Sequence, residues 1–261
     1  MLFRSVLADS IAALLALDPP PWELLIVDQT PSHEAACDAR LGRWHDQGLI
    51  RWLRLSRPSI TNAMNQALLQ ARGDSVLFLD DDILPDPELV QAHQQAACRH
   101  PGAMIAGRVL QPWHGGQADD ENGPFLFNSL RPRQIETFMG GNVAIPRRQA
   151  LDLGGFDANF VKVAYHFEAE FAHRWCAADL PIFYEPSALI HHLRAERGGT
   201  RSYGKHLTTL RPDHAVGRYY FLLRTRPLPQ ACAASLSDLL RSVDRKSTRL
   251  NSSHLVISYA V

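Results

Sequence analysis

Residues 75–82 read SVLFLDDD, an apolar run that ends in three consecutive aspartates, Asp80, Asp81 and Asp82. The run predicts a buried strand, followed by a proline-led helix. Three adjacent carboxylates repel one another, so at a strand end they indicate a cation that offsets their charge. Oxygen ligands favour Mg²⁺ or Mn²⁺, and since side chains alternate along an extended chain, Asp80 and Asp82 can share one ion while Asp81 points elsewhere. The alternative is a solvated turn that caps the next helix.

Helices and strands alternate on both sides of this run. The apolar spacing predicts helices over residues 6–17, 34–47, 61–72, 85–100, 147–153 and 168–178, and strands over residues 22–28, 50–55, 75–79, 182–184 and 188–190. This order predicts an α/β sheet with right-handed crossovers. In such sheets ligands bind at the carboxyl ends of the strands, where Asp28 and the triple aspartate fall. The Gly- and Pro-rich residues 111–133 predict a long loop.

The composition bounds the kinds of protein that the chain can be. It has 261 residues, 46% hydrophobic and 21% charged, which suits one globular domain with or without an appendage. The formal net charge is zero, so no overall field draws the protein to nucleic acid or to an anionic membrane. The four cysteines form no CxxC pair and indicate reduced thiols in a cytoplasmic protein. No apolar run reaches the ~20 residues of a membrane span, and the start predicts no signal peptide.

Both ends of the chain differ in character from the middle. The Ser- and Asn-rich residues 244–254, DRKSTRLNSSH, read like a translated sequencing adapter, and residues 2–5, LFRS, like the opposite adapter. We therefore expect residues 244–261 to be an artefactual tail outside the fold, the alternative being a genuine disordered segment. The domain that remains spans residues 6–228 and is followed by a helix or linker over residues 229–243.

Two further groups of polar residues have the chemistry of a site. His191 and His192 end an apolar strand, where one imidazole can complete a metal shell; the alternative is a structural histidine bonded to backbone. Glu168 and Glu170 lie at the start of a helix, where one carboxylate can act as a general base on an acceptor hydroxyl. The alternatives are favourable charge at a helix N-terminus and a simple i, i+4 pair between Glu170 and Arg174.

These features occur in the order found in a known family. The chain resembles the family 2 glycosyltransferases of the GT-A fold, a large inverting group, over roughly residues 6–225. The segments that carry the resemblance are WELLIVDQT, ALLQARGDSVLFLDDDILPDPELV, GGNVAIPR, LGGFDANF and YEPSALIHH. The resemblance implies a Rossmann-like mixed sheet flanked by helices, the nucleotide-diphospho-sugar transferase fold.

The resemblance also implies a role for each matching residue. Asp28, Asp80 and Asp81 are expected at the nucleotide of the donor. Asp80, Asp82 and His192 are expected to hold a divalent metal, Mn²⁺ or Mg²⁺, that bridges the donor's diphosphate. Glu168 falls where the family has its catalytic base. Five residues are expected at the sugar and acceptor: Gly140, Gly141, Asn142, Glu170 and Arg174.

Three departures from the family pattern stand out. The family's Glu-Asp catalytic pair reads Phe-Glu and ends at Glu168, which lengthens the base by one methylene. An Arg-Asn pair reads Met64-Asn65, which removes a cation that faces the diphosphate, and Arg197 or Arg201 is a candidate substitute. The family's first strand, which precedes its first helix, has no counterpart, and we expect it to be missing from a chain truncated at its N-terminus.

The sequence therefore predicts a metal-dependent enzyme that moves a sugar from a nucleoside-diphosphate sugar to an acceptor hydroxyl with inversion. The acceptor is expected to be a saccharide or glycolipid of a cell-envelope polysaccharide. The enzyme is expected in the cytoplasm or peripherally at the inner face of the membrane. Two alternatives stay open: a nucleotidyltransferase on a similar sheet, and a degenerate module that binds nucleotide sugars without turnover.

Overall fold

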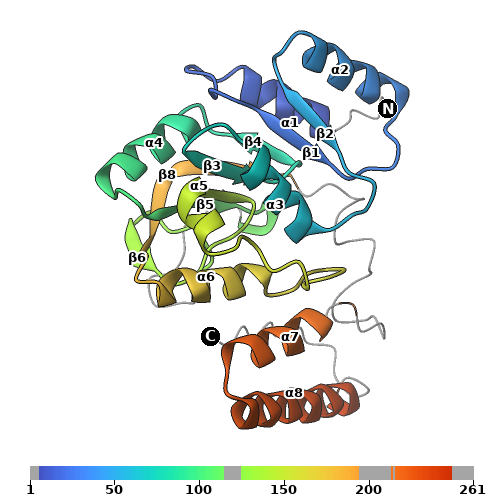
Figure 1. Cartoon of the computed structure of the whole chain (residues 1–261), viewed down its shortest axis with the longest axis vertical. Helices are drawn as coiled ribbons and strands as arrows, with labels where there is room; N and C mark the ends of the chain where they lie inside the picture. Colours follow the sequence, from blue (N-terminus) through green and yellow to red (C-terminus); the bar gives the residue numbers. More distant parts are fainter. Residues whose placement is uncertain (1–5, 115–124, 194–212, 214, 249–261) are drawn as a thin grey trace.

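The computed structural model describes residues 6–114, 125–193, 213 and 215–248, with helices packed around β-strands (Figure 1). Arg197 and Arg201 lie outside these residues, as do residues 249–261 of the expected tail. The helices are α1 (Val6–Leu15), α2 (Ala35–Asp46), α3 (Ile60–Gln70), α4 (Leu89–Arg99), the 3₁₀ turn η1 (Pro112–His114), α5 (Arg147–Asp152), α6 (Phe167–Ala177), α7 (Ala215–Thr225) and α8 (Leu228–Thr248). The strands are β1 (Leu25–Asp28), β2 (Arg51–Arg54), β3 (Ser75–Leu79), β4 (Ile83–Pro85), β5 (Met104–Leu110), β6 (Arg133–Ile135), β7 (Asn142–Pro146) and β8 (Ile182–His192).

The larger sheet is mixed and has the strand order β3-β7-β5-β8-β4, with β6 paired to β8. β8 runs parallel to β5 and antiparallel to β4 and β6. β7 runs antiparallel to both β3 and β5. The predicted mixed α/β sheet flanked by helices is therefore confirmed.

Side chains of the larger sheet alternate between two apolar layers, as the two-residue period of a strand requires. On β7, Val143 and Ile145 enter the main core with residues of α3, α5 and α6, whereas Ala144 faces α4 on the other side. The main core is largely aromatic, and its fully buried members include Trp175 and Tyr184. Helices thus cover both faces, and the strand ends are left for a site.

The structure corrects two of the predicted elements in this sheet. The helix expected from residue 85 begins only at Leu89, because Ile83–Pro85 pairs with β8 as an edge strand, where a proline needs no ladder partner for its missing N–H. The two strands expected over residues 182–184 and 188–190 are one strand, β8, whose register against β5 shifts between Gly107 and Arg108. This irregularity takes up the intervening residues of β8.

At the C-terminus, α7 packs against α6 and α8 follows as the second arm of a helical hairpin (Figure 1). The described part of α8 runs from Leu228 to Thr248, so the helix continues across the boundary expected at residues 243 and 244. Within the described residues, none of the helices combines the length and the hydropathy that a membrane-spanning segment needs.

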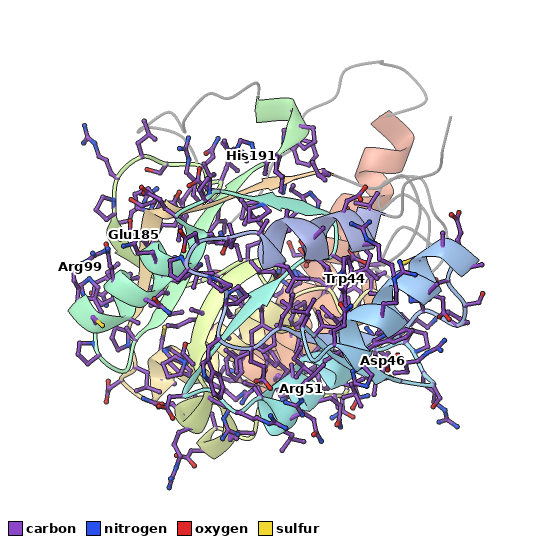
Figure 2. All side chains as sticks on the ribbon, turned by 90° about the horizontal axis from the view of Figure 1, so that it is seen from above. Trp44, Asp46, Arg51, Arg99, Glu185 and His191 are labelled. Carbon is purple, nitrogen blue, oxygen red and sulfur yellow. The ribbon has the colours of Figure 1, made fainter. Side chains whose placement is uncertain are left out.

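The first two strands form a separate sheet. β1 and β2 pair in parallel, and no described strand lies between β1 and β3. Seen from above, Trp44, Asp46 and Arg51 mark this side of the molecule, and the ion-paired Arg99 and Glu185 mark the opposite side (Figure 2).

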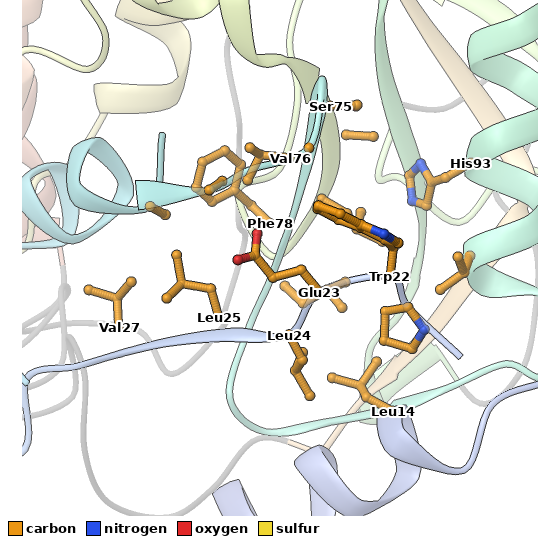
Figure 3. Close-up of a pocket in the computed structure, with 18 of the residues that line it drawn as sticks. Leu14, Trp22, Glu23, Leu24, Leu25, Val27, Ser75, Val76, Phe78 and His93 are labelled. Atoms are coloured by element: carbon orange, nitrogen blue, oxygen red, sulfur yellow. The ribbon is translucent and has the colours of Figure 1, made fainter. Parts of the chain in front are cut away.

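A cavity of about 430 Å³ separates β1 from β3. Leu24, Leu25 and Val27 line one wall, and Val76 and Phe78 line the other (Figure 3). The two sheets therefore meet through side chains and not through backbone hydrogen bonds.

Candidate active site

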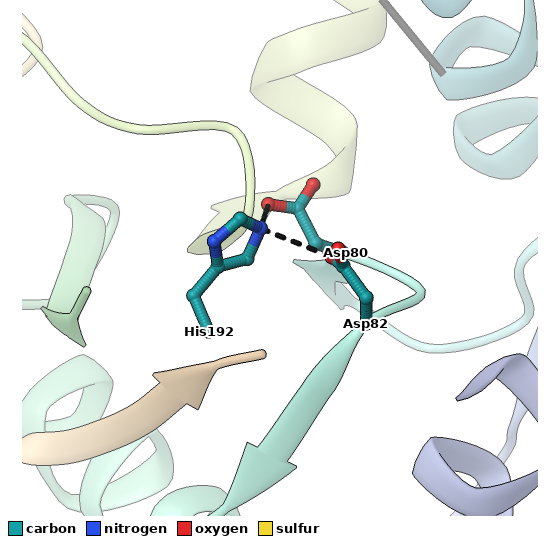
Figure 4. A group of neighbouring side chains, drawn as sticks. All are labelled: Asp80, Asp82 and His192. Carbon is teal, nitrogen blue, oxygen red and sulfur yellow. Dashed lines mark ion pairs between the residues drawn. The ribbon is translucent and has the colours of Figure 1, made fainter. Parts of the chain in front are cut away.

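The three predicted metal ligands meet at the end of the larger sheet. Asp80 follows β3, Asp82 precedes β4 and His192 ends β8, and one ligand atom of each lies within 4.8 Å of the others. His192 Nε2 is 3.0 Å from Asp82 Oδ1 and 3.5 Å from Asp80 Oδ2 (Figure 4). The antiparallel register that sets Ile83 opposite His192 brings these groups together. Two carboxylates and an imidazole are suitable donors for Mn²⁺ or Mg²⁺.

Gln111, which the sequence did not single out, orients the histidine. His192 Nδ1 lies 2.9 Å from Gln111 Oε1, just beyond the end of β5. An amide oxygen accepts, so Nδ1 donates to Gln111, and this leaves Nε2 as the ring nitrogen that faces the two carboxylates and would be available to a metal ion. A ligating histidine is usually oriented by a second hydrogen bond of this kind.

The aspartates differ in exposure. The Asp82 side chain is 5% exposed, whereas that of Asp80 is 48% exposed and faces the open end of the site. Asp81 is exposed and lines the adjacent cavity with Asp80. The turn therefore presents one buried and two accessible carboxylates.

A diglycine turn before β7 separates Asp80 from Glu168. The Gly140 N–H donates to Glu168 Oε1 at 2.6 Å, and the Gly141 carbonyl accepts from the Asp80 N–H at 3.2 Å. A Cβ on Gly141 would lie 2.6 Å from Asp80 Cγ, and one on Gly140 would lie 3.1 Å from Glu168 Oε1. These positions are glycine because a side chain would occupy the space of the two carboxylates. The turn thus holds a metal-site aspartate and the predicted base on either side of one backbone segment.

Glu168 has the ionisation behaviour of a general base. Burial of its carboxylate raises the pKa of Glu168 to about 7, the negative charge of Asp80 acts in the same direction, and the Gly140 hydrogen bond opposes both. A carboxylate with a pKa near neutrality accepts a proton readily at physiological pH. Glu168 lies in the first turn of α6. Three residues just before this helix, Lys162, Ala164 and His166, have left-handed backbone conformations.

We expect Gly141→Ala to impair the metal site without unfolding the protein. The three heavy atoms nearest to the added methyl group all belong to the end of the Asp80 side chain, which can rotate away, so the melting temperature should stay within a few degrees of wild type. Rotation removes one ligand oxygen, and Mn²⁺ affinity, measured by calorimetry, should fall by about tenfold or more, or ~1.4 kcal/mol.

Gly42→Ala is the matched control for this substitution. Gly42 lies within α2, and a Cβ there meets nothing within 4 Å. This variant should bind Mn²⁺ as the wild type does. Wild-type affinity in Gly141→Ala would contradict the role given to the turn.

A second cavity, of about 500 Å³, opens where β1 and β3 end. The three aspartates predicted at the nucleotide, Asp28, Asp80 and Asp81, all line it, together with Thr30 and Lys162. Its volume is in the range of small-molecule sites, which is about 300–1,000 Å³. The structure therefore brings these predicted residues to one pocket beside the metal ligands.

Asp28 is held firmly at the bottom of this pocket. Its carboxylate accepts from the Thr30 N–H at 2.8 Å and from Trp52 Nε1 at 3.0 Å, and lies 2.7 Å from His33 Nε2. Burial would raise the pKa of Asp28, but the hydrogen bonds from His33, Thr30 and Trp52 outweigh it and hold that pKa below its usual value. Asp28 is thus a fixed, ionised acceptor. Its contacts with Trp52 and His33 depend on tertiary packing and could not be predicted from the sequence.

The remaining predicted residues are engaged inside the fold. Asn142 is fully buried, and its amide nitrogen donates to the Arg108 and Ala188 carbonyls while its oxygen accepts from His93 Nε2 at 2.8 Å. Asn142 therefore joins β7 to β5, β8 and α4, and its side chain does not face the site. The expectation that it contacts the sugar gains no support from this position.

Glu170 and Arg174 form a bidentate pair, with Nε–Oε1 and Nη2–Oε2 distances of 2.8 Å. Arg174 also donates to the carbonyls of Leu153 and Gly155. The pair thus fixes the loop at Gly154 and Gly155 to α6. This contact matches the structural alternative for Glu170 and Arg174, a simple i, i+4 pair. Met64, at the position of the missing cation, is buried in the main core, where it offers no charge to a ligand.

A mixed α/β sheet with an Asp-x-Asp turn, a facing histidine and a pocket at the strand ends defines a GT-A-type nucleotide-diphospho-sugar transferase fold. The model of the family "Glycosyl transferase family 2" matches residues 4–152, and the chain belongs to this family. No curated protein matches the chain.

Solved glycosyltransferases share the fold. PcManGT, a mannosyltransferase from Pyrobaculum calidifontis in complex with GDP-Man and Mn²⁺, is 15% identical with a TM-score of 0.60, and the match covers 95% of this chain and 72% of that one. S. aureus TarS 1-349 with UDP-GlcNAc is 14% identical with a TM-score of 0.62, and the match covers 84% of this chain and 62% of that one. GalNAc-T7 with UDP, GalNAc and Mn²⁺ is 14% identical with a TM-score of 0.58, and the match covers 86% of this chain and 48% of that one. The chain thus spans less than two thirds of the length of the last two, and at these identities the likeness is one of fold.

Proposed function

We propose that the protein transfers a sugar from a nucleoside-diphosphate sugar to the hydroxyl of a saccharide or glycolipid, with inversion at the anomeric carbon. The observation that carries this proposal is the diglycine turn, because it holds Asp80 of the metal cluster and Glu168, a carboxylate with a pKa of about 7, side by side. Family membership supports the reaction class. The acceptor and the membrane-face location remain expectations from the sequence.

The donor is proposed to lie between the two strand ends. Asp28 accepts hydrogen bonds from the base or ribose. Asp80, Asp82 and His192 would hold Mn²⁺ or Mg²⁺, and the bound ion would supply positive charge to the departing nucleoside diphosphate. The Mn²⁺ and nucleotide ligands of the neighbours PcManGT and GalNAc-T7 support this assignment.

Glu168 is proposed to deprotonate the acceptor. Its carboxylate takes the hydroxyl proton as the acceptor oxygen bonds to the anomeric carbon, and the bond from that carbon to the diphosphate oxygen breaks. The attack comes from the face opposite the leaving group, so one displacement inverts the configuration. Asn142, Glu170 and Arg174 act by positioning the backbone around this centre.

A screen of UDP- and GDP-sugars tests the proposal. With Mn²⁺, a donor present at about 100 times its Kd stabilises by about 2.7 kcal/mol, which raises the melting temperature of a protein of this size by about 5–10 °C. We expect this shift for at least one donor with Mn²⁺ and its loss with EDTA. No shift with any donor would contradict the proposal.

Product analysis with the stabilising donor separates the alternatives. A transferase releases the nucleoside diphosphate. A nucleotidyltransferase instead consumes added pyrophosphate with the nucleotide sugar and forms a nucleoside triphosphate and a sugar phosphate, and a binding module forms no product. Proton NMR of the new glycosidic bond then reports whether the anomeric configuration is inverted.

A further inference from the structure

Lys162 brings a positive charge to a pocket whose other charged residues are acidic. Among the described residues that line the 500 Å³ cavity, it is the one base, and it shares the cavity with Asp28, Asp80 and Asp81. The negative charge of the three carboxylates alone would repel a nucleoside diphosphate. A cation held by Asp80, Asp82 and His192 would offset part of this negative charge on one side, and the ammonium group of Lys162 offsets part of it on another.

The backbone around Lys162 is held in a costly conformation. Lys162, Ala164 and His166 have φ values of 62°, 53° and 71°, in the left-handed region that residues with a side chain rarely adopt. Several such residues in one short segment persist only where the surrounding structure enforces them, and they concentrate at functional sites. This segment runs from the cavity to the start of α6, where Glu168 lies.

Helix α7 enforces that conformation. Gly217 approaches so closely that a Cβ on it would lie 2.9 Å from the Tyr165 backbone nitrogen. The His166 ring stacks on Phe221 with centroids 5.0 Å apart, and Tyr220 packs edge-on against Phe160, also at 5.0 Å. Packing against α7 therefore holds the chain on both sides of Lys162, at Phe160 and at Tyr165 and His166.

An ion pair with Asp213 then holds the ammonium group at the cavity. The Asp213 side chain is 7% exposed and that of Lys162 is 44% exposed, so the carboxylate is enclosed while the lysine remains accessible. An ammonium group has three N–H donors, and one partner leaves the others for a ligand. Lys162 can therefore keep Asp213 and donate to an anionic oxygen in the pocket.

We propose that Lys162 binds the diphosphate of the donor and that Asp213 positions it for this contact. The inference rests on the proposed function, and it names the side chain that complements the metal at the phosphates. A charge-assisted hydrogen bond to phosphate favours the diphosphate over the uncharged nucleoside. Lys162 thus determines how strongly the pocket selects a charged ligand.

The test compares wild type with Lys162→Met and Lys162→Arg in the full chain. Calorimetry with Mn²⁺ gives the Kd of UDP and GDP and, for each, of the parent nucleoside. We expect Lys162→Met to weaken the tighter of the two diphosphates by about tenfold or more and to change the nucleoside Kd less than twofold. Lys162→Arg keeps the charge and should recover most of the affinity.

Two further variants distinguish ligand binding from a structural role. Asp213→Asn leaves the charge on Lys162 but removes its anchor, and should weaken the diphosphate less than Lys162→Met does. Arg148→Met, which removes an exposed base paired with Asp152 on α5, should match wild type. If Lys162→Met and Asp213→Asn raise the nucleoside and diphosphate Kd values equally, Lys162 is only a tether and the inference is wrong.

The outcomes also separate this inference from the proposed function. Equal diphosphate affinity in wild type and Lys162→Met would overturn the inference alone. If the wild type binds neither UDP nor GDP with Mn²⁺, the proposed function fails and the inference fails with it.

Discussion

Glu168→Gln is expected to lower kcat by about 10²–10⁴-fold, the usual contribution of a general base. The amide keeps the size of the side chain and can still accept from the Gly140 N–H, but it cannot take a proton from the acceptor. The Kd of the nucleoside diphosphate should change less than twofold, because Glu168 lies across the diglycine turn from the metal ligands. Single-turnover kinetics and calorimetry measure the two quantities separately.

Glu34→Gln is the matched control, since Glu34 is an exposed carboxylate that precedes α2. It should leave kcat unchanged. Wild-type turnover by Glu168→Gln would remove Glu168 from its role, whereas a parallel loss of nucleotide affinity would point to a disturbed pocket.

The pH dependence of the same reaction should carry the signature of Glu168. Its pKa is raised to about 7, so the carboxylate is protonated and inactive below that pH and ionised and active above it. The kcat/KM of wild type should therefore rise about tenfold per pH unit on the acid side and level off above neutrality. A cation bound at Asp80 would offset the negative charge that contributes to this raised pKa. The pH midpoint of kcat, measured with metal and donor bound, should therefore lie below that of kcat/KM. Glu168→Gln should lack this ionisation.

Asp82→Asn is expected to abolish the response to metal. Asp82 is the buried carboxylate of the cluster, 3.0 Å from His192 Nε2, and an amide is a much weaker ligand for a hard cation. Mn²⁺ affinity should fall by more than about 100-fold, which exceeds the usual loss when only a hydrogen-bond partner of a metal ligand is removed. Donor-dependent stabilisation with Mn²⁺ should disappear. The metal-free variant should melt no lower than wild type, because the substitution relieves repulsion with Asp80.

Asp81→Asn serves as the comparison within the same turn. Asp81 is exposed and is absent from the three-residue metal cluster, so its loss should reduce Mn²⁺ affinity by less than tenfold. Equal effects of the two substitutions would mean that the aspartates act only through their summed charge. A lower melting temperature for metal-free Asp82→Asn would instead give that carboxylate a role in stability.

The sequence predicted the parts of the site that lie at strand ends. Asp28 and the triple aspartate each follow an apolar run, and the rule that ligands bind at the carboxyl ends of strands was enough to associate them. His192 was found in the same way, at the end of β8. The mixed sheet followed from the family resemblance, since the alternation of helices and strands alone implied only an α/β sheet.

Tertiary pairing accounts for what the sequence did not predict. Gln111 lies 81 residues before His192 and meets it only because β5 and β8 are neighbours. The structural role of Asn142 is set by two strands, β5 and β8, and by helix α4, which approach it from different parts of the chain. Lys162 carries no motif, and its importance depends on left-handed backbone and on contacts with α7. Local patterns cannot encode such relations.

The split between the two sheets gives the donor a second task. Asp28 belongs to the unit of β1, β2 and α2, which shares a small apolar cluster with α1, whereas Asp80 belongs to the larger sheet. No backbone ladder joins these units across β1 and β3, so regions of this kind open with different free energies. A molecule that contacts Asp28 with its base and the metal at Asp80 with its phosphates links both units. Donor binding therefore also stabilises the contact between the two units. A variant that weakens donor affinity should for the same reason lose part of the protection against local unfolding that the donor provides.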